Sequence, residues 1–422
     1  MARIVLCTLG SLGDLHPYIA VAQALARRGH TPVLATHETY RAKIEALGLA
    51  FHAVRPELPG WDHHPELIHR WMDQRHGTER IVREFVMPAL HESYADTLAA
   101  ATAGPVAADL LVSHPLTFTT RLVAETTGIA WASSLLAPLG FLSTTDPSVL
   151  PNAEVLARFR GLGPGPLRAV YALGKAMAAP WADPVHKLRA ELGLPATREN
   201  PLFEGQHSPD LVLALFSHWL AKPQPDWPPR TKVTGFPFFE DETPLSPQLE
   251  RFLEEGAAPI VFTLGSSAVH AAGAFYEESA LVARHLGRRA VLLVGNAPGA
   301  TPSRDLLTLG YAPYARLFPR AAAIVHQGGV GTTAEAMRSG RPQLIVPFAH
   351  DQPDNAERIS RRGIGRTLQR STYSAASAAH TLQEMLADEP LQQRAQEIGS
   401  HIRKEDGATT AAVELERRTR RA

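Results

Sequence analysis

An apolar run that leads directly into a glycine turn is the feature that most constrains how this chain can fold. Residues 321–325 are all apolar, and His326-Gln-Gly-Gly-Val-Gly-Thr-Thr follows them at once. A helix-compatible segment, 332–338, leads out of the turn. A strand, a glycine turn and a helix in this order place free backbone N–H groups where they can hold phosphate. The sequence therefore predicts an α/β sheet with an anion site at the end of one strand.

The residues of this turn suit a diphosphate. Gly328, Gly329 and Gly331 let the backbone approach a ligand closely. Thr332 and Thr333 can add hydroxyl donors at the start of the following helix.

A second polar pair follows the next apolar strand along the chain. Asp351-Gln352 comes shortly after the strand expected at 344–346. An acid beside an amide at the carboxyl end of a strand suits the hydroxyl groups of a sugar. A diphosphate turn and a sugar site with this spacing indicate a nucleotide-sugar donor.

The same turn has a competing interpretation. Gly329-Val-Gly-Thr-Thr-Ala334 also matches the G-x-G-x-x-A fingerprint of dinucleotide sites. Such a site belongs on the first strand of its unit, whereas strands expected at 260–264 and 290–294 precede this one. A nicotinamide-dependent oxidoreductase is therefore a less favoured alternative, as is a structural turn without a ligand.

Length and composition favour two domains in a reducing compartment. The chain has 422 residues, with 42 basic and 42 acidic side chains, so nothing argues for nucleic acid. The one cysteine, Cys7, excludes an internal disulfide and lies in an apolar run, where a small core residue is expected. No signal peptide and no run long enough to span a bilayer is visible, so we expect a soluble cytoplasmic protein without stable membrane insertion.

Apolar runs alternate with helical patterns in both halves, which predicts an α/β fold with two parallel sheets. The first half opens with a strand at 4–9 and a helix at about 17–28. A proline-dense stretch, 223–247, is expected to be a linker, because proline resists both helix and central strand. The predicted domains are therefore 1–222 and 248–422.

These motifs resemble the signature of family 1 glycosyltransferases, whose GT-B fold places two Rossmann-like domains on either side of a cleft. Within the family the chain is similar to the bacterial branch that includes the macrolide, glycopeptide and sterol glycosyltransferases. The closest likeness is to the rhamnosyltransferase of rhamnolipid synthesis, and it is carried by Asp226-Trp-Pro-Pro, Thr234-Gly-Phe-Pro, Val261-Phe-Thr-Leu-Gly-Ser and Tyr311-Ala-Pro. The resemblance implies that domain 1–222 binds the acceptor and domain 248–422 the donor. It also implies that the last helix, about 395–422, returns to the first domain.

The resemblance implies further donor contacts. Tyr311 would stack on the base, and the main chain at Ala312 would read the edge of that base. Glu335 would accept hydrogen bonds from ribose, and His326 would donate to a phosphate oxygen. A second glycine turn, Gly265-Ser266-Ser267, could close on the diphosphate. The alternatives are a core tyrosine, an exposed helix acid and a structural histidine.

The chemistry also needs a base that takes the proton from the acceptor hydroxyl. Asp14, in the turn after the first strand, is the predicted base, with His16 as the fallback. Ser11 and Gly13 in the same turn would lie beside the acceptor. Capping of the first helix is the alternative role of Asp14.

Relatives that use a histidine base orient it with an aspartate at the end of a later strand. The matching position in this chain is His114, so we predict an inverted pair, Asp14 with His114. Two segments without strand character, 57–94 and 139–180, follow strand ends and are expected to shape the acceptor pocket.

The sequence thus predicts an inverting, metal-independent transferase without a cofactor. It would move a sugar from a UDP-glucose-type donor, or from dTDP-rhamnose, to a lipophilic small molecule. The Asp-x-Asp motif of metal-dependent sugar transferases is absent, and the clustered His63, His64 and His69 lack the spacing of metal ligands. A catalytically silent partner protein with the same fold is the alternative of a different class.

Overall fold

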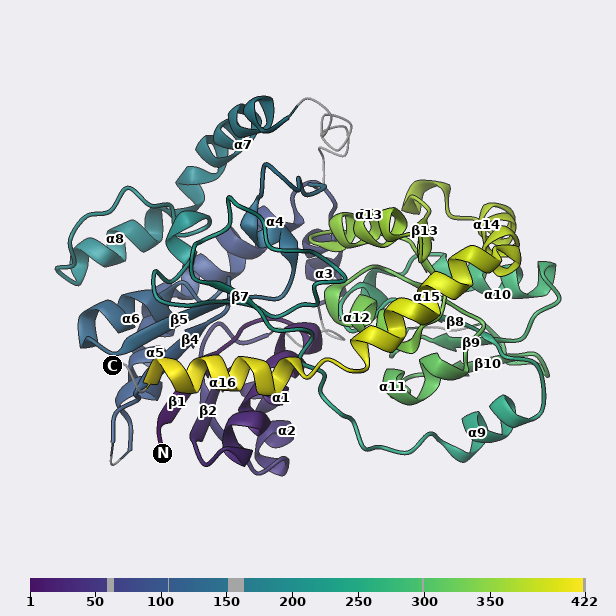
Figure 1. Cartoon of the computed structure of the whole chain (residues 1–422), viewed down its shortest axis with the longest axis horizontal. Coiled ribbons are helices and arrows are strands. Elements are labelled where there is room, and N and C mark those ends of the chain that lie inside the picture. The colour runs from purple at the N-terminus through teal and green to yellow at the C-terminus, as the bar shows by residue number, and fades with distance from the viewer. Residues whose placement is uncertain (59–63, 105, 151–162, 298–299, 420–422) are drawn as a thin grey trace.

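Two parallel β-sheets form the framework of the protein (Figure 1). The computed structural model describes residues 1–58, 64–104, 106–150, 163–297 and 300–419. Within these residues the first sheet has the strand order β3-β2-β1-β4-β5-β6-β7, and the second has the order β10-β9-β8-β11-β12-β13. Each order reverses beside its first strand, at the points where open α/β sheets bind ligands. The predicted pair of Rossmann-like halves is confirmed.

The first half contains seven strands among the described residues. They are β1 (Arg3–Cys7), β2 (Thr31–Thr36), β3 (Ala50–Ala53), β4 (Leu110–Ser113), β5 (Ala130–Leu135), β6 (Val212–Ala214) and β7 (Thr231–Val233). Its α-helices are α1 (Leu12–Arg27), α2 (Arg41–Ala46), α3 (Pro65–Trp71), α4 (Gly77–Arg80), α5 (Leu90–Thr102), α6 (Thr119–Thr127), α7 (Pro164–Ala178) and α8 (Asp183–Glu191).

The second half repeats the pattern of strand and helix. Its strands are β8 (Ile260–Thr263), β9 (Ala290–Leu293), β10 (Leu306–Leu309), β11 (Ala323–His326), β12 (Gln343–Ile345) and β13 (Gly365–Thr367). Its α-helices are α9 (Pro247–Glu254), α10 (Phe275–His285), α11 (Tyr314–Leu317), α12 (Val330–Ser339), α13 (Gln352–Arg362), α14 (Ala375–Ala387) and α15 (Glu389–Ile402), and α16 (Gly407–Thr419) ends the chain.

The central strands are buried along their whole length. All residues of β4, β8, β9 and β11 are buried, as expected for parallel strands that are covered on both faces by helices. Cys7, in β1, is a buried residue of the same core. Among the described helices, none is long and apolar enough to cross a membrane.

Two elements differ from the expectations. Helix α1 begins at Leu12, five residues before the start expected at Pro17, which instead lies inside the helix. Ser11 caps this helix and forms a capping box with Asp14, a local signal that outweighs the preference of proline for the first turn. Strand β7 lies inside the segment that was expected to be a linker. It is an edge strand and needs only one neighbour, β6.

The last helix packs on the first half. Helix α15 packs on α12, whereas α16 continues beyond it and packs on α1 (Figure 1). Arg28, at the end of α1, donates through Nε to Glu416 Oε2 at 2.9 Å. Leu415 is 0% exposed and belongs to the same core cluster as β1.

We expect Leu415→Ala to lower the free energy of unfolding by about 3 kcal/mol, because it leaves a cavity between α16 and α1. The matched control is Leu173→Ala on α7, whose side chain is 64% exposed. The control should change the free energy by less than about 0.5 kcal/mol. Denaturant unfolding measures both. Equal effects would show that α16 does not contribute to the core of the first half.

Candidate active site

The start of α1 holds the predicted base in place. The Ser11 backbone N–H donates to Asp14 Oδ2 at 2.8 Å, and Ser11 Oγ lies 3.2 Å from the same oxygen. Ser11 Oγ also accepts from the Gly13 N–H at 3.2 Å. Ser11 is therefore the N-cap, and Asp14 is the third residue of the helix, whose carboxylate completes the capping box.

His114, at the carboxyl end of β4, contacts the other carboxylate oxygen. His114 Nε2 lies 3.4 Å from Asp14 Oδ1, and the Asp14 side chain is 32% exposed. His114 Nδ1 accepts from the Leu116 N–H at 3.2 Å, so the proton of the neutral ring is on Nε2, facing Asp14. The structure thus brings the predicted pair together, with Asp14 as the member that can still accept a proton.

The charge of Asp14 is set by two opposing effects. Burial raises the pKa of Asp14, but the hydrogen bond from His114, the positive charge that His114 carries when protonated, and the hydrogen bonds from Ser11 outweigh it. The pKa therefore lies below its usual range, and Asp14 is ionised at neutral pH.

A third residue of this cluster, His37, was missed by the sequence analysis. It follows β2, is 0% exposed, and accepts from the Gly10 N–H through Nε2 at 2.9 Å. Its Nδ1–H donates to the Pro56 carbonyl at 2.6 Å, and burial lowers its pKa to about 4. A Cβ atom on Gly10 would lie 2.3 Å from Asp14 Oδ2, so Asp14 packs directly on this turn. The sequence did contain a signal for this residue, because His37 directly follows β2, the strand beside β1.

On the opposite side, the start of α13 carries the predicted sugar-binding residues. Asp351 Oδ2 accepts from Asn355 Nδ2 at 2.7 Å, and the same nitrogen donates to the Gly328 carbonyl at 2.8 Å. Gln352 Oε1 accepts two backbone N–H groups of the preceding turn, at 2.8 and 3.1 Å. The Gln352 amide nitrogen is therefore the group that can donate to a sugar hydroxyl.

Asp351 and Asp14 influence each other across the two halves. Burial, assisted by the negative charge of Asp14, raises the pKa of Asp351 to about 7, against the hydrogen bond from Asn355. The preceding residue, His350, has a left-handed φ of 58°. Its Nδ1 lies 3.0 Å from Thr78 Oγ1 on α4, which links this turn to the first half.

A cavity of ≈ 330 Å³ lies between the two halves. The predicted donor-binding residues in its lining are Gly265, Ser266, Tyr311, Gly331, Thr332 and Glu335, and Gly13 and His16 line it from the first half. The other predicted donor residues are outside this lining; they are Ser267, Ala312, His326, Gly328, Gly329, Thr333, Asp351 and Gln352. Asp14 is also outside it, so His16 lies on the cavity side of α1 and Asp14 on the side of His114.

The N-terminus of α12 faces this cavity. Gly329 is its N-cap and supplies no side-chain hydrogen bond, so the first N–H groups of the helix are available to an anion. A Cβ atom on Gly331 would lie 3.8 Å from the Gly13 Cα atom, so the first turns of α12 and α1 almost meet. Gly328 has φ +92°, and a Cβ atom there would lie 2.7 Å from Ile345 Cγ2.

His326 does not line the cavity. It is 0% exposed, and its Nδ1 accepts from the Gly328 N–H at 3.1 Å. Its Nε2–H then donates to Gln343 Oε1, also at 3.1 Å, and burial lowers its pKa to about 4. The predicted bond from His326 to phosphate would require one of these contacts to break. In this structure the side chain supports the glycine turn instead.

The segment after β7 forms a wall of the cavity, which the sequence analysis did not anticipate. Phe236, Phe238, Phe239 and Asp241 all contribute to this wall. The Tyr311 hydroxyl donates to Asp241, and the tyrosine is 57% exposed, as a residue that stacks on a base must be.

His16 and Glu335 are two further titratable residues in the cavity lining. The His16 ring centroid lies 4.9 Å from that of Phe239, and burial with the charge of Lys43 lowers the pKa of His16 to about 4. Glu335 is 16% exposed and lies 3.8 Å from Arg338. Burial, with the charge of Glu240, raises the pKa of Glu335 to about 7 despite this arginine.

The first of the two expected acceptor segments, 57–94, packs beside His37 at the end of β2. Trp71, on α3, is buried, and its ring centroid lies 4.7 Å from the ring centroid of Phe85. The ring centroid of Phe85 lies 6.2 Å from the ring centroid of His37. Residues 59–63, including His63, and residues 151–162 of these segments are outside the described part of the chain. In the part that the structure describes, no group of three or more His, Cys, Asp or Glu side chains could hold a metal ion.

Comparison with known proteins identifies both halves. Residues 4–138 match the N-terminal domain of glycosyltransferase family 28, and residues 285–416 match the C-terminal domain of erythromycin biosynthesis protein CIII-like proteins. The chain is 33% identical to O-mycaminosyltylonolide 6-deoxyallosyltransferase of Streptomyces fradiae, over 98% of this chain and 97% of that protein. It is 30% identical to glycosyltransferase GtfE of Amycolatopsis orientalis, over 97% and 96% of the two chains.

Two further likenesses are more distant. A sterol 3-beta-glucosyltransferase of Aspergillus fumigatus is 27% identical over 97% of this chain. The matched region is 29% of the length of that protein. The solved structure of glycosyltransferase VinC in complex with dTDP has a TM-score of 0.68 at 20% identity, over 100% of both chains, and shows the shared fold. The chain therefore belongs to the family 1 glycosyltransferases of GT-B fold, in the branch with the macrolide, glycopeptide and sterol enzymes, and is a nucleotide-sugar-dependent glycosyltransferase.

Proposed function

We propose that this enzyme transfers a hexose from a pyrimidine nucleoside diphosphate to a hydroxyl group of a lipophilic small molecule, with inversion and without a metal ion. One observation carries the proposal. The uncapped N-terminus of α12, the Asp351-Gln352 turn and the Asp14–His114 pair converge where the two halves meet. These are the three parts that the transfer needs: an anion site, a sugar site and a base.

The residues divide the chemistry between them. The Asp14 carboxylate takes the proton of the acceptor hydroxyl, and His114 holds Asp14 in position through its Nε2–H. The acceptor oxygen forms a bond to the anomeric carbon, while the bond from that carbon to the diphosphate breaks and the diphosphate leaves with the electron pair. The N-terminus of α12 and Thr332 stabilise its negative charge. Attack from the opposite face converts an α-linked donor into a β-linked product.

Different observations support two donors. Glu335 lies in the cavity wall, where it can accept from both hydroxyls of a ribose, which favours a UDP-glucose-type donor. The dTDP bound to VinC and the deoxyhexose transferred by the Streptomyces relative favour a dTDP-sugar, dTDP-rhamnose among them. The macrolide and sterol named for the relatives support a lipophilic acceptor, a natural product or a lipid.

A thermal-shift panel with UDP, dTDP, GDP and NADH tests the donor site. A ligand that binds only the native state at about 100 times its Kd adds about 2.7 kcal/mol of stability and raises the Tm. We expect UDP or dTDP to do so, and NADH to have no effect. A shift with NADH alone would contradict the proposal. Slow hydrolysis of the bound sugar nucleotide, measured without acceptor, would in turn exclude a catalytically silent partner protein.

We expect Asp14→Asn to lower kcat by about a thousandfold, because the amide cannot take the proton of the acceptor. His114→Ala should lower kcat by about tenfold to a hundredfold, because Asp14 loses its orienting partner. Both variants should keep the Kd of the nucleotide. Steady-state kinetics and calorimetry measure these effects, with His91→Ala as control, since its 64% exposed side chain lies outside the site. Near-normal turnover of His114→Ala would show that the pair does not act together.

The affinity for UDP-glucose should rise with pH through about 7. Glu335 and Asp351 both have a pKa raised to about 7, so below this pH they are protonated and accept fewer hydrogen bonds from the ligand. Bound hydroxyl groups favour the ionised carboxylates, and binding therefore releases protons. Glu335→Gln should remove one of the two proton releases, as calorimetry in buffers of different ionisation enthalpy can show. A profile identical to that of the wild type would remove Glu335 from the donor site.

A further inference from the structure

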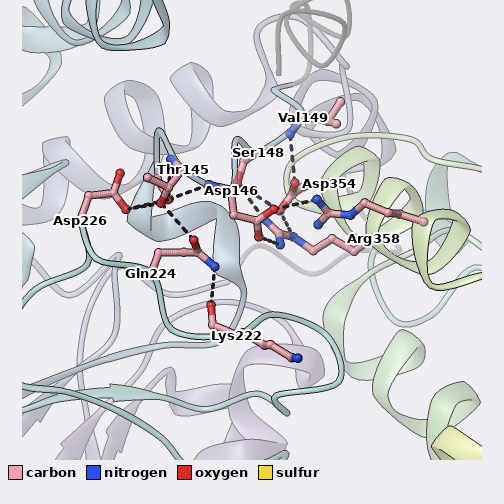
Figure 2. Close-up of polar contacts among 11 residues, drawn as sticks. Thr145, Asp146, Ser148, Val149, Lys222, Gln224, Asp226, Asp354 and Arg358 are labelled. Atoms are coloured by element: carbon pink, nitrogen blue, oxygen red, sulfur yellow. Dashed lines mark hydrogen bonds and ion pairs between the residues drawn. The ribbon is translucent and has the colours of Figure 1, made fainter. Parts of the chain in front are cut away.

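Residues 142–149 connect the two halves through polar contacts away from the donor cavity (Figure 2). They follow β5 and the 3₁₀ turn η4 (Pro138–Phe141), at the carboxyl edge of the first sheet. Leu142 opens the segment with a left-handed φ of 45°, which turns the chain away from the sheet.

The segment is anchored on the first half by Asp226. The carboxylate of Asp226 accepts from Ser143 Oγ at 2.7 Å, from the Thr144 N–H at 2.6 Å and from Thr144 Oγ1 at 2.9 Å. Next to these contacts, the rings of Phe141 and Trp227 stack at 4.1 Å. Burial raises the pKa of Asp226, but these hydrogen bonds lower it below its usual value, so the anchor is charged at neutral pH.

The other end of the segment is anchored on α13. Arg358 donates through Nε to Asp354 Oδ2 at 2.8 Å and also forms an ion pair with Asp146 (Figure 2). The Val149 N–H donates to Asp354 Oδ1 at 3.0 Å, and Ser148 Oγ donates to Asp354 Oδ2 at 3.2 Å.

This ion cluster is buried. The side chains of Arg358, Asp354 and Asp146 are 1%, 0% and 13% exposed. Arg361, which is 41% exposed, also pairs with Asp146 at 2.8 Å. Removing one partner from such a cluster leaves a largely buried charge poorly paired, which is unfavourable. Segment 142–149 and α13 therefore hold one relative position.

The position of α13 matters because its first residues carry the sugar site. Asp354 is the third residue of α13, two residues after Gln352, and Arg358 lies one turn further along the same face. Asn355, which holds both Asp351 and the Gly328 carbonyl, lies between them. A shift of α13 along its axis would therefore move the sugar-binding groups.

We infer that Asp146 and Arg358 are positioning residues for the donor sugar. The inference rests on the proposed function. No residue of the ion cluster lines the donor cavity. In that cavity, Tyr311, Glu335 and the N-terminus of α12 would hold the nucleotide. Loss of the cluster thus weakens the contribution of the sugar to binding and leaves the contribution of the nucleoside diphosphate unchanged.

The test compares the Kd values of UDP and UDP-glucose, and of dTDP and dTDP-glucose, by calorimetry. Asp146→Asn keeps the shape of the side chain and removes its charge. We expect this variant to bind the sugar nucleotide that the wild type prefers about tenfold more weakly, because the charge-assisted contacts to Arg358 and Arg361 weaken, and the free diphosphate within about twofold of the wild type. The matched control is Glu416→Gln, which removes an ion pair between α16 and α1 that does not touch α13.

Each outcome decides the inference. Equal weakening of the diphosphate and its sugar derivative, or no change in either with a fold intact by Tm, overturns it. If Asp146→Asn does not fold, Ser148→Ala replaces it, because that variant removes only the hydroxyl contacts to Asp354 and Arg358. It should show the same selective weakening, by about twofold to fivefold. A wild-type protein that binds neither diphosphate would instead overturn the proposed function.

Discussion

The near contact between two helix N-termini constrains everything that the centre of this protein can bind. Helices α1 and α12 begin at the carboxyl ends of β1 and β11, and their first turns approach until Gly13 and Gly331 almost touch. Each N-terminus carries a partial positive charge and N–H groups without helical partners. Asp14 neutralises the end of α1 from within its capping box, whereas α12 has no side-chain cap. This difference suits the proposed division, with the diphosphate at α12 and the acceptor base at α1.

The surroundings of these helix ends shift the pKa values of two carboxyl groups, Asp14 and Asp351, in opposite directions. Asp14 is held ionised, because His114 and Ser11 compensate for its burial. Asp351 has hydrogen bonds from Asn355 and from its own backbone against its burial, and it also experiences the charge of Asp14, so its pKa rises to about 7. One group is suited to accept a proton from the acceptor, and the other to share hydrogen bonds with the hydroxyls of a sugar.

What the sequence could predict here was local. The alternation of strands and helices and the glycine turns at strand ends follow from hydrophobic patterns, whereas the pairing of Asp14 with His114 was expected from the resemblance to the family. The direction in which the His326 ring faces cannot be predicted from such a pattern, because it depends on Gln343 of the neighbouring strand. The cavity wall at Phe238 and Phe239 and the contacts of Arg358 depend on how the two halves dock, which no local pattern encodes.

Docking of the halves also explains why the sugar site needs support from the acceptor side. In the proposed mechanism the base and the anomeric carbon must be closely aligned, yet Asp14 lies in the first half and the sugar site at Asp351 in the second. Asp14 does not itself line the nucleotide cavity, so contacts outside this cavity would have to help to align them. A continuous line of contacts runs from Asp226 through residues 143–149 to Arg358, and α13 then carries it to Asp351. In the proposed mechanism, these contacts would hold the sugar site at Asp351 in a fixed position relative to the base Asp14.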